Sequence, residues 1–308
     1  MAGESSGNVH HPAALELSAT ARPNFLLLTP VCVFLGVAAA RYADPGAGSV
    51  LALALVLAGA LLAHVSVNML NEYEDFRSGL DGITRRTPFS GGSGTLPGNP
   101  RLAAYTLASG VLALVGTTVI GLYFTLQLGL ALVPLGALGV LVVATYSTHI
   151  VRFPLACLVA PGLGFGLLMV TGTALALTGH YSGTAVLASL LPFFLVSNLL
   201  LLNQFPDLEA DRRVGRRHLP IVLGRRRSAL VYAAMLAATY VTIVAAVAAG
   251  EFPPPTLLGL ITAALAVPVA VGAYRHADDL EALTPLLGLN VLITLATPVL
   301  VGVGFLLG

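Results

Sequence analysis

The chain has 308 residues, of which 56% are hydrophobic and 9% are charged, and its mean hydropathy is +0.89. A chain this apolar is excluded from the class of water-soluble enzymes. The formal net charge of +1 gives no reason to expect a nucleic-acid partner. All 15 basic residues are arginines, so their positions carry more information than their number.

Residues 1–21 form a polar N-terminal segment, and residues 22–308 are expected to form one transmembrane domain. From Pro23 onward the chain falls into apolar runs of about 18–25 residues, the length that a helix needs to cross a bilayer. A polar break around Thr125 and Gln127 separates the third run from the fourth. We predict an all-α membrane protein with nine transmembrane helices, near residues 23–41, 49–71, 102–122, 127–146, 154–178, 184–204, 228–249, 255–274 and 284–307.

The arginines predict the orientation of these spans. Nine alternating spans place the N-terminus and the loops at 72–101, 147–153, 205–227 and 275–283 on one side of the membrane. Every arginine except Arg41 falls on that side. By the positive-inside rule that side is cytoplasmic. We therefore expect an integral protein of the cell (plasma) membrane whose two longest loops face the cytoplasm.

Two similar polar segments follow the second and the sixth predicted spans. The first reads Asn-Glu-Tyr-Glu-Asp over residues 71–75 and continues to Gly79 and Asp81, whereas the second contains Asp207 and Asp211. The pattern Asp-x-Arg-x-Gly occurs in both, at residues 75–79 and 211–215. Four spans lie between the two copies, so both leave the membrane at the same face. This similarity is consistent with an internal duplication.

Helical spacing places the polar residues of each segment on one face of its helix. Asparagine inside an apolar span is costly unless its amide is satisfied, which favours side chains that line a polar cavity. The residues that share a face where the span reaches the cytoplasmic surface are His64, Asn68, Asn71 and Asp75 on the second span, and Asn203, Asp207 and Asp211 on the sixth.

Carboxylates on two facing helices beside several arginines are the groups that a magnesium-bridged diphosphate requires. Mg²⁺ prefers carboxylates together with substrate phosphate oxygens, and arginine donates paired hydrogen bonds to the remaining phosphate oxygens. The alternative interpretation of each acid is a solvated loop carboxylate that offsets nearby arginines. Two such clusters at matching depth favour the diphosphate site, with Mg²⁺ as the cofactor.

Taken together, these motifs and the arginine-rich stretch that ends at Leu223-Gly224 resemble the UbiA superfamily of intramembrane prenyltransferases. The spacing is most similar to the MenA-like branch, which prenylates 1,4-dihydroxy-2-naphthoate. The resemblance implies nine helices around a central cavity that opens to membrane lipid and is capped by the cytoplasmic loops. It also implies transfer of a polyprenyl group from a prenyl diphosphate to a hydroxylated aromatic acceptor, as in menaquinone biosynthesis.

The resemblance also implies the residues of the site. The catalytic residues are Asp75, Asp81, Asp207 and Asp211, and Asn71 and Glu72 join these four as metal ligands. The implied substrate contacts are Arg22, Asn68, Asn71, Glu72, Arg77, Arg85, Arg86, Tyr146, Arg152, Asn203 and Arg213. Two departures stand out: Glu72 occupies a position where the family usually has Asp, and Arg152 or His149 replaces a lysine that often follows the fourth span.

Three other functions are compatible with parts of the sequence. A membrane terpene cyclase would ionise the same donor without an external acceptor, and an ether-lipid prenyltransferase would use a non-aromatic acceptor. A transporter would also carry polar helices and repeats, but its ion sites are expected near the bilayer midplane. Here the acids lie at the cytoplasmic ends of the spans, which argues against a transporter.

Overall fold

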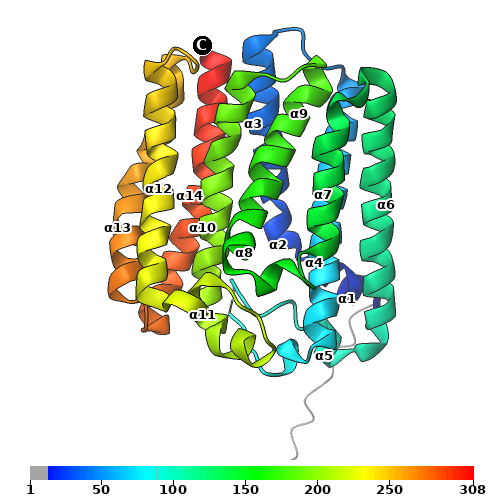
Figure 1. Cartoon of the computed structure of the whole chain (residues 1–308), viewed down its shortest axis with the longest axis vertical. Helices are drawn as coiled ribbons and strands as arrows, with labels where there is room; N and C mark the ends of the chain where they lie inside the picture. The colour runs from blue at the N-terminus through cyan, green and yellow to red at the C-terminus, as the bar shows by residue number, and fades with distance from the viewer. Residues whose placement is uncertain (1–12, 88) are drawn as a thin grey trace, which may run out of the picture.

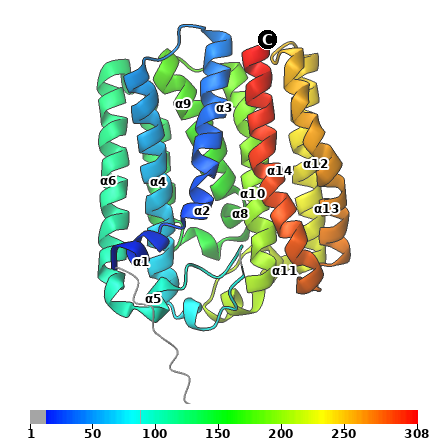
Figure 2. The ribbon, with the colours of Figure 1, turned by 180° about the vertical axis from the view of Figure 1, so that it is seen from behind.

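The computed structural model describes residues 13–87 and 89–308, and every regular element within these ranges is a helix. The long helices stand side by side as a bundle (Figures 1 and 2). The predicted class, an all-α membrane protein, is confirmed. Residues 1–12 of the predicted polar segment lie outside the described residues, and helix α1 (Ala13–Ala19) forms part of the remainder.

Eight helical spans in the described ranges are long and apolar enough to cross a membrane. A ninth apolar segment, Leu130–Thr145, is shorter and consists of η3 (Leu130–Leu132) and α7 (Val133–Thr145). The nine predicted spans therefore correspond to eight long spans and one short one. The long spans are α2–α3 (Pro23–Leu26, Leu28–Ala43), α4 (Val50–Arg77), η2–α6 (Pro100–Leu102, Ala103–Leu128), α8–η5–α9 (Pro154–Gly162, Leu163–Leu168, Met169–Thr178), α10 (Gly183–Arg213), α12 (Arg225–Ala248), η6–α13 (Pro254–Thr262, Ala263–Arg275) and α14 (Leu280–Leu307).

The remaining short helices gather at one end of the bundle, the lower end in Figures 1 and 2, which we call the loop end. They are η1 (Leu80–Gly82), α5 (Thr95–Gly98), η4 (Ile150–Arg152) and α11 (Leu219–Leu223). The C-terminus lies at the opposite end (Figure 1). An odd number of passes places the start of the first span and the end of the last span at opposite ends of the bundle.

The turn between the third and fourth passes lies later in the chain than the polar residues predicted. Helix α6 continues through Thr125 and Gln127 to Leu128, and Thr125 bonds the carbonyl of Gly121 through its hydroxyl. The chain turns instead at Gly129, whose φ of 83° is a conformation that favours glycine. A threonine satisfied by its own helix does not end that helix, which explains the error.

Helices α4 and α10 extend beyond the predicted ends of their spans. The sequence placed loops from residues 72 and 205, whereas the helices end at Arg77 and Arg213. The acidic segments are therefore helical. Residues three and four positions apart in them lie on the same face of the helix. Because α4 and α10 lie on opposite sides of the same cavity, the two extensions bring their acids toward one another.

Helix α10 lies in the middle of the bundle and is 67% buried over its most apolar window, compared with 17% for the η2–α6 span. Gly162 and Gly166 pack against the backbone of α10, where a Cβ atom on either glycine would overlap Phe193. Small residues four apart allow such close approach between membrane helices. The π-helical segment η5 follows Gly162 and contains Gly166, and it places Phe165 at the wall of the cavity.

Candidate active site

A cavity of about 970 Å³ opens between α4, α6, α7, η5 and α10. Along α4 its lining runs from Val56 to Asp75, which corresponds to about 28 Å at 1.5 Å per helical residue. The deep walls are apolar and include Phe124, Leu135 and Leu168. Polar side chains are concentrated at the loop end, where residues of the segment 80–92 also line the cavity. The cavity therefore has a hydrocarbon-like body and a charged end, which we call its mouth.

The predicted polar face of α4 lines this cavity. Asn68, Asn71 and Asp75 all border it, as does His64 one turn further inside. Asn71 donates from Nδ2 to Asp75 Oδ2 at 2.9 Å, and its own Oδ1 accepts a hydrogen bond from Ser147 at 3.1 Å. The amide of Asn71 therefore links α4 to the segment that follows α7.

The polar face of α10 borders the same cavity from the other side. Asn203, Asp207 and Asp211 line it as predicted. Asn203 Oδ1 and Asp207 Oδ1 are buried and have no hydrogen-bond partner among the described residues. A buried acceptor without a partner is destabilising, so these oxygens are positioned for a donor or cation that a ligand supplies.

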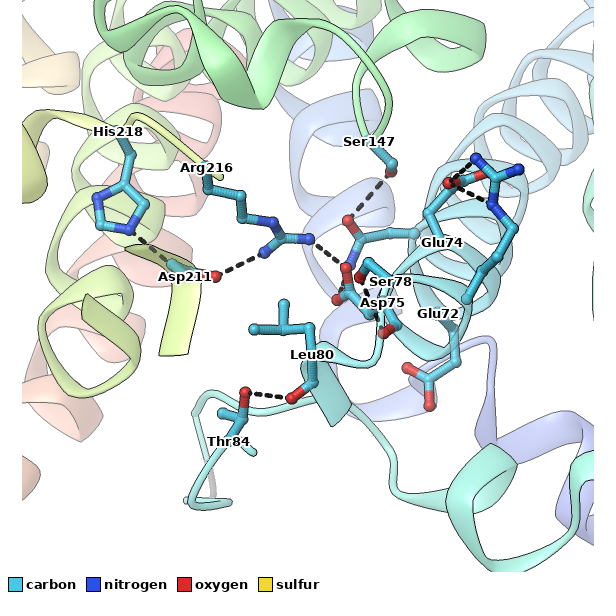
Figure 3. Close-up of polar contacts among 12 residues, drawn as sticks. Glu72, Glu74, Asp75, Ser78, Leu80, Thr84, Ser147, Asp211, Arg216 and His218 are labelled. Atoms are coloured by element: carbon cyan, nitrogen blue, oxygen red, sulfur yellow. Dashed lines mark hydrogen bonds and ion pairs between the residues drawn. The ribbon is translucent and has the colours of Figure 1, made fainter. Parts of the chain in front are cut away.

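Arg216 joins the two acidic helices. Its guanidinium contacts Asp75 of α4 through Nη2 and donates to Asp211 of α10 through Nη1 at 3.0 Å, as Figure 3 shows. The carboxylates of Asp75 and Asp211 raise the pKa of Arg216, although its burial acts in the opposite direction. The positive charge thus remains at the mouth of the cavity, between the helices that the sequence identified as the two halves of the site.

Asp211 is also held by His218. The His218 Nε2 atom lies 2.9 Å from Asp211 Oδ2, and the imidazole is almost fully buried. An ionised carboxylate only accepts hydrogen bonds, so His218 can hold such a carboxylate through a proton on Nε2. The two oxygens of Asp211 therefore have different partners, Arg216 on one side and His218 on the other.

Glu72 does not face the cavity. It is fully buried, and its Oε2 accepts from Arg22 Nε at 3.1 Å and Nη2 at 2.9 Å. The backbone N–H of Ser93 donates to Oε1 at 3.0 Å. Gly92 passes so close that a Cβ there would lie 3.0 Å from Asp81 Oδ1. Glu72 therefore holds Arg22 and the loop around residue 93 at the site.

Arg22 is the non-glycine residue in the described ranges that has a positive φ, 53°. It precedes Pro23, and a residue before proline is disfavoured in the ordinary helical region. Its Nη2 atom lies 2.9 Å from Glu72 Oε2 and 3.8 Å from Asp75 Oδ2. These ion pairs keep a strained residue at the mouth of the cavity, where strain is often associated with function.

Asp81 follows the end of α4 and is turned back into the site. Its Oδ2 is buried without a partner, and burial, assisted by the charges of Glu72 and Asp75, raises its pKa to about 7. Arg22 and Arg86 oppose this shift. A bound cation would favour the ionised form of such a carboxyl group.

The other predicted contacts lie in different places. Tyr146 lines the cavity. Arg77 and Arg152 line a smaller pocket beside the cavity. Arg85, Arg86 and Arg213 are exposed and do not line either of these two cavities, although Arg86 packs against Gly94. The roles predicted for these arginines stay predictions.

Several residues of the site were not singled out by the sequence. Arg216 and His218 follow the turn at Gly215, whose φ of 81° reverses the chain after α10. That glycine and its distance from Asp211 were visible in the sequence, but nothing distinguished Arg216 from the six other arginines between residues 212 and 227. Ser147 and Ser93 reach the site only through contacts between distant segments.

The fold and this site define a membrane enzyme class, and comparison with known proteins identifies it. Residues 27–293 match the UbiA prenyltransferase family, so the chain belongs to that family and is a prenyltransferase. The transporter interpretation is therefore wrong. The 1,4-dihydroxy-2-naphthoate octaprenyltransferase of Haemophilus influenzae is 26% identical over 303 residues, covering 94% of this chain and 95% of the relative.

Solved structures share the fold. A digeranylgeranylglyceryl phosphate synthase has a TM-score of 0.66 at 13% identity, covering 96% of this chain and 99% of its own. A UbiA homologue from Archaeoglobus fulgidus bound to DMAPP and Mg²⁺ has a TM-score of 0.58 at 13% identity, covering 94% and 99%. At these identities the similarity establishes the fold alone.

Proposed function

We propose that this protein transfers a polyprenyl group from a prenyl diphosphate to a hydroxylated aromatic acid similar to 1,4-dihydroxy-2-naphthoate, with Mg²⁺ as cofactor. One observation carries the proposal: α4 and α10 present their acids to each other at the mouth of an apolar cavity, and Arg216 bridges Asp75 and Asp211 there. A charged mouth suits the diphosphate, and the apolar body suits an isoprenoid tail.

The residues at the mouth fit a magnesium–diphosphate pair. Among the described residues, no three acidic, histidine or cysteine side chains converge to hold a metal by themselves. Mg²⁺, however, is commonly bound by one or two carboxylates together with substrate phosphates. The unpartnered oxygens of Asp81, Asn203 and Asp207 are available for such a site. Asp75 and Asp211 become available when Arg216 turns from them to a phosphate.

When bound, Mg²⁺ would neutralise charge on the leaving diphosphate. Asp75, Asp81, Asp207 and Asp211 would hold it, with Asn71 as a further oxygen ligand. Arg22 and Arg216 would donate to the remaining phosphate oxygens. Because both oxygens of Glu72 are already occupied, we assign Glu72 to orienting Arg22 and the loop at Ser93 instead of direct metal binding.

The reaction follows from this placement. The bond between C1 of the donor and the diphosphate oxygen breaks, and the electron pair leaves with the diphosphate. An electron-rich ring carbon then attacks the allylic cation and a carbon–carbon bond forms. The ring regains aromaticity when the attacked carbon loses its proton to water or, where that carbon carries the carboxylate, loses carbon dioxide. Arg22 and Arg216 stabilise the developing negative charge. The apolar walls around Phe165 and Leu168 keep water from the cation.

The acceptor assignment rests on the relative that acts on 1,4-dihydroxy-2-naphthoate and matches nearly the whole chain. Asn68 and Asn203 lie beside the acids and offer amide groups that suit hydroxyl and carboxylate substituents. Membrane terpene cyclisation and ether-lipid synthesis remain the alternatives, and a synthase of the latter kind shares the fold. The distribution of arginines further supports a cytoplasmic loop end and a place in the cell membrane.

The experiment is incubation of purified protein with Mg²⁺, prenyl diphosphates of several lengths and one acceptor at a time. 1,4-Dihydroxy-2-naphthoate and 4-hydroxybenzoate at equal concentrations are compared by mass spectrometry of the lipid products. The proposal expects preference for the naphthoate. Preference for the benzoate, for a glycerol phosphate or for no acceptor would contradict the acceptor assignment.

A further inference from the structure

A second cavity of about 280 Å³ lies beside Asp75, between the end of α4, the segment 147–152 and residues 214–216. Eight of its ten lining residues are polar or charged, and the two apolar ones are Val151 and Val214. Arg77, Ser78 and Arg152 at its rim are exposed. We call it the polar side pocket. Its surface is unlike that of the large cavity, whose body is apolar.

The polar side pocket and the large cavity share one wall. Asp75, Val151 and Arg216 line both. Asp75 and Val151 are buried, and the Arg216 side chain is 18% exposed. The contact between Arg216 and Asp75 therefore separates the two spaces, and Figure 3 shows this pair beside Ser147, which also lines the pocket.

The two products of the proposed reaction differ in polarity and therefore require different routes out of the site. The prenylated ring is apolar and can pass from the large cavity into lipid. Inorganic diphosphate carries several negative charges, and transfer of such charges through hydrocarbon is prohibitively costly. It therefore requires a polar route to water from a position next to Asp75 and Arg216, and the polar side pocket begins at those two residues.

The arginines of the polar side pocket are arranged by depth. Arg216 lies at the inner wall, and Arg152 and Arg77 lie at the exposed rim. Arg77 is paired with Glu74 at 3.0 Å, whereas the guanidinium of Arg152 forms no ion pair with any described residue. The pocket is lined by these three arginines and by two carboxylates, Glu74 and Asp75, so positive charge is in excess and lowers the energy of an anion along the path. The lack of aromatic or extended apolar walls makes the pocket unsuitable for an aromatic acceptor.

We propose that the polar side pocket is the exit route for inorganic diphosphate, and that Arg77 and Arg152 guide the anion to water. This inference rests on the proposed prenyl transfer. The rim arginines stabilise the diphosphate in transit and not at its site of formation. For Arg77 and Arg152 this role replaces the substrate contacts that the resemblance implies, because neither residue borders the large cavity. Their loss slows diphosphate release while leaving carbon–carbon bond formation and the equilibrium affinity for diphosphate at the site unchanged.

The test uses full-length Arg152→Gln and Arg77→Gln proteins, with Arg212→Gln as the matched control. Arg212 is an exposed arginine of the same face that lines neither cavity. Quenched samples give the single-turnover rate of product formation, and a fluorescent diphosphate sensor gives the rate at which free diphosphate appears. The route predicts that diphosphate appears about two- to fivefold more slowly in both rim variants, the effect of removing one partly exposed ionic contact. The single-turnover rate stays at the wild-type value.

A reversible block gives a second readout. In a protein without Cys32 and Cys157, Ser78→Cys at the exposed rim is modified by a bulky anionic thiol reagent and then restored by a reductant. Modification is expected to slow diphosphate appearance and multiple turnover but not the first turnover. Equal loss of the first turnover, or diphosphate release unchanged in all variants and in the blocked protein, overturns the exit route. Absence of product in the wild-type protein would instead refute the proposed function itself.

Discussion

Arg216 binds Asp75, a residue 141 positions earlier in the chain, while its other amino group binds Asp211 on α10. One guanidinium thus occupies the place between the acidic helices where a diphosphate and its metal are expected. Opposite charge is needed there whether or not substrate is bound, because Asp75 and Asp211 are both buried. We expect Arg216 to exchange its carboxylate partners for phosphate oxygens when the donor binds.

Arg216→Gln should lower prenyl transfer by about 10²-fold or more, the typical effect of losing one donor that stabilises transition-state charge. Arg216→Lys keeps the charge but loses the paired geometry, so partial activity is expected. The measurement is kcat and KM for the prenyl diphosphate. A Gln variant with wild-type kcat would show that the guanidinium only pairs with Asp75 and Asp211 in the substrate-free protein and does not assist the reaction.

Asp207→Asn should abolish turnover while the folded protein persists, since Asp207 Oδ1 has no hydrogen-bond partner to lose. Glu209→Gln is the matched control, because Glu209 lies on the same helix with its side chain 68% exposed. Activity is followed across a Mg²⁺ titration, and thermal unfolding in detergent reports the fold. Retention of most activity in Asp207→Asn at any Mg²⁺ concentration would contradict a role for the Asp207 carboxylate as a metal ligand.

Glu72→Gln should destabilise the protein, because it removes the negative charge that pairs with Arg22 and replaces one of the two acceptor oxygens with an NH₂ donor that faces Arg22 or the N–H of Ser93. Breaking a buried ion pair typically costs about 3–5 kcal/mol, and the lower end applies because Arg22 is 22% exposed. The KM for donor should rise while the Mg²⁺ dependence stays unchanged. A strong loss of apparent Mg²⁺ affinity would instead restore Glu72 as a metal ligand.

Gly166→Ala should disrupt the packing of η5 on α10, since the added Cβ would meet Phe193 N at 2.6 Å. Gly164→Ala is the control in the same helical turn, where nothing lies within 4 Å. Overpacking typically costs about 1–3 kcal/mol. We expect a lower midpoint of thermal unfolding for Gly166→Ala alone, and equal stability of the two variants would argue against the close approach.

The orientation of the bundle can be tested by cysteine labelling. Ser90 lies at the loop end and Ser182 precedes α10 at the other end. Single cysteines at these positions, in a protein without Cys32 and Cys157, should react from opposite sides of the membrane in intact cells, with residue 90 accessible only from the cytoplasm. Labelling of both cysteines from the same side would refute the predicted arrangement of the spans, which places residues 90 and 182 on opposite sides of the membrane.

The sequence predicted those features that depend on periodicity. Residues three and four apart, such as Asn71 and Asp75 or Asp207 and Asp211, do line one cavity because regular helices extend through both segments. It could not predict that Glu72, one position from Asn71, turns away and binds Arg22, because that depends on where the chain before α2 returns. Nor could it separate Arg216 from its neighbours, since only the turn at Gly215 selects which arginine reaches Asp75.

The most direct test of the proposed function is the stoichiometry of diphosphate release by purified wild-type protein. With a polyprenyl diphosphate, Mg²⁺ and 1,4-dihydroxy-2-naphthoate, we predict one inorganic diphosphate for each prenylated ring, and almost none when either Mg²⁺ or the acceptor is omitted. Release of diphosphate without acceptor, together with a cyclised hydrocarbon, would contradict aromatic prenylation. Absence of release with every acceptor offered would contradict the diphosphate-ionising site itself.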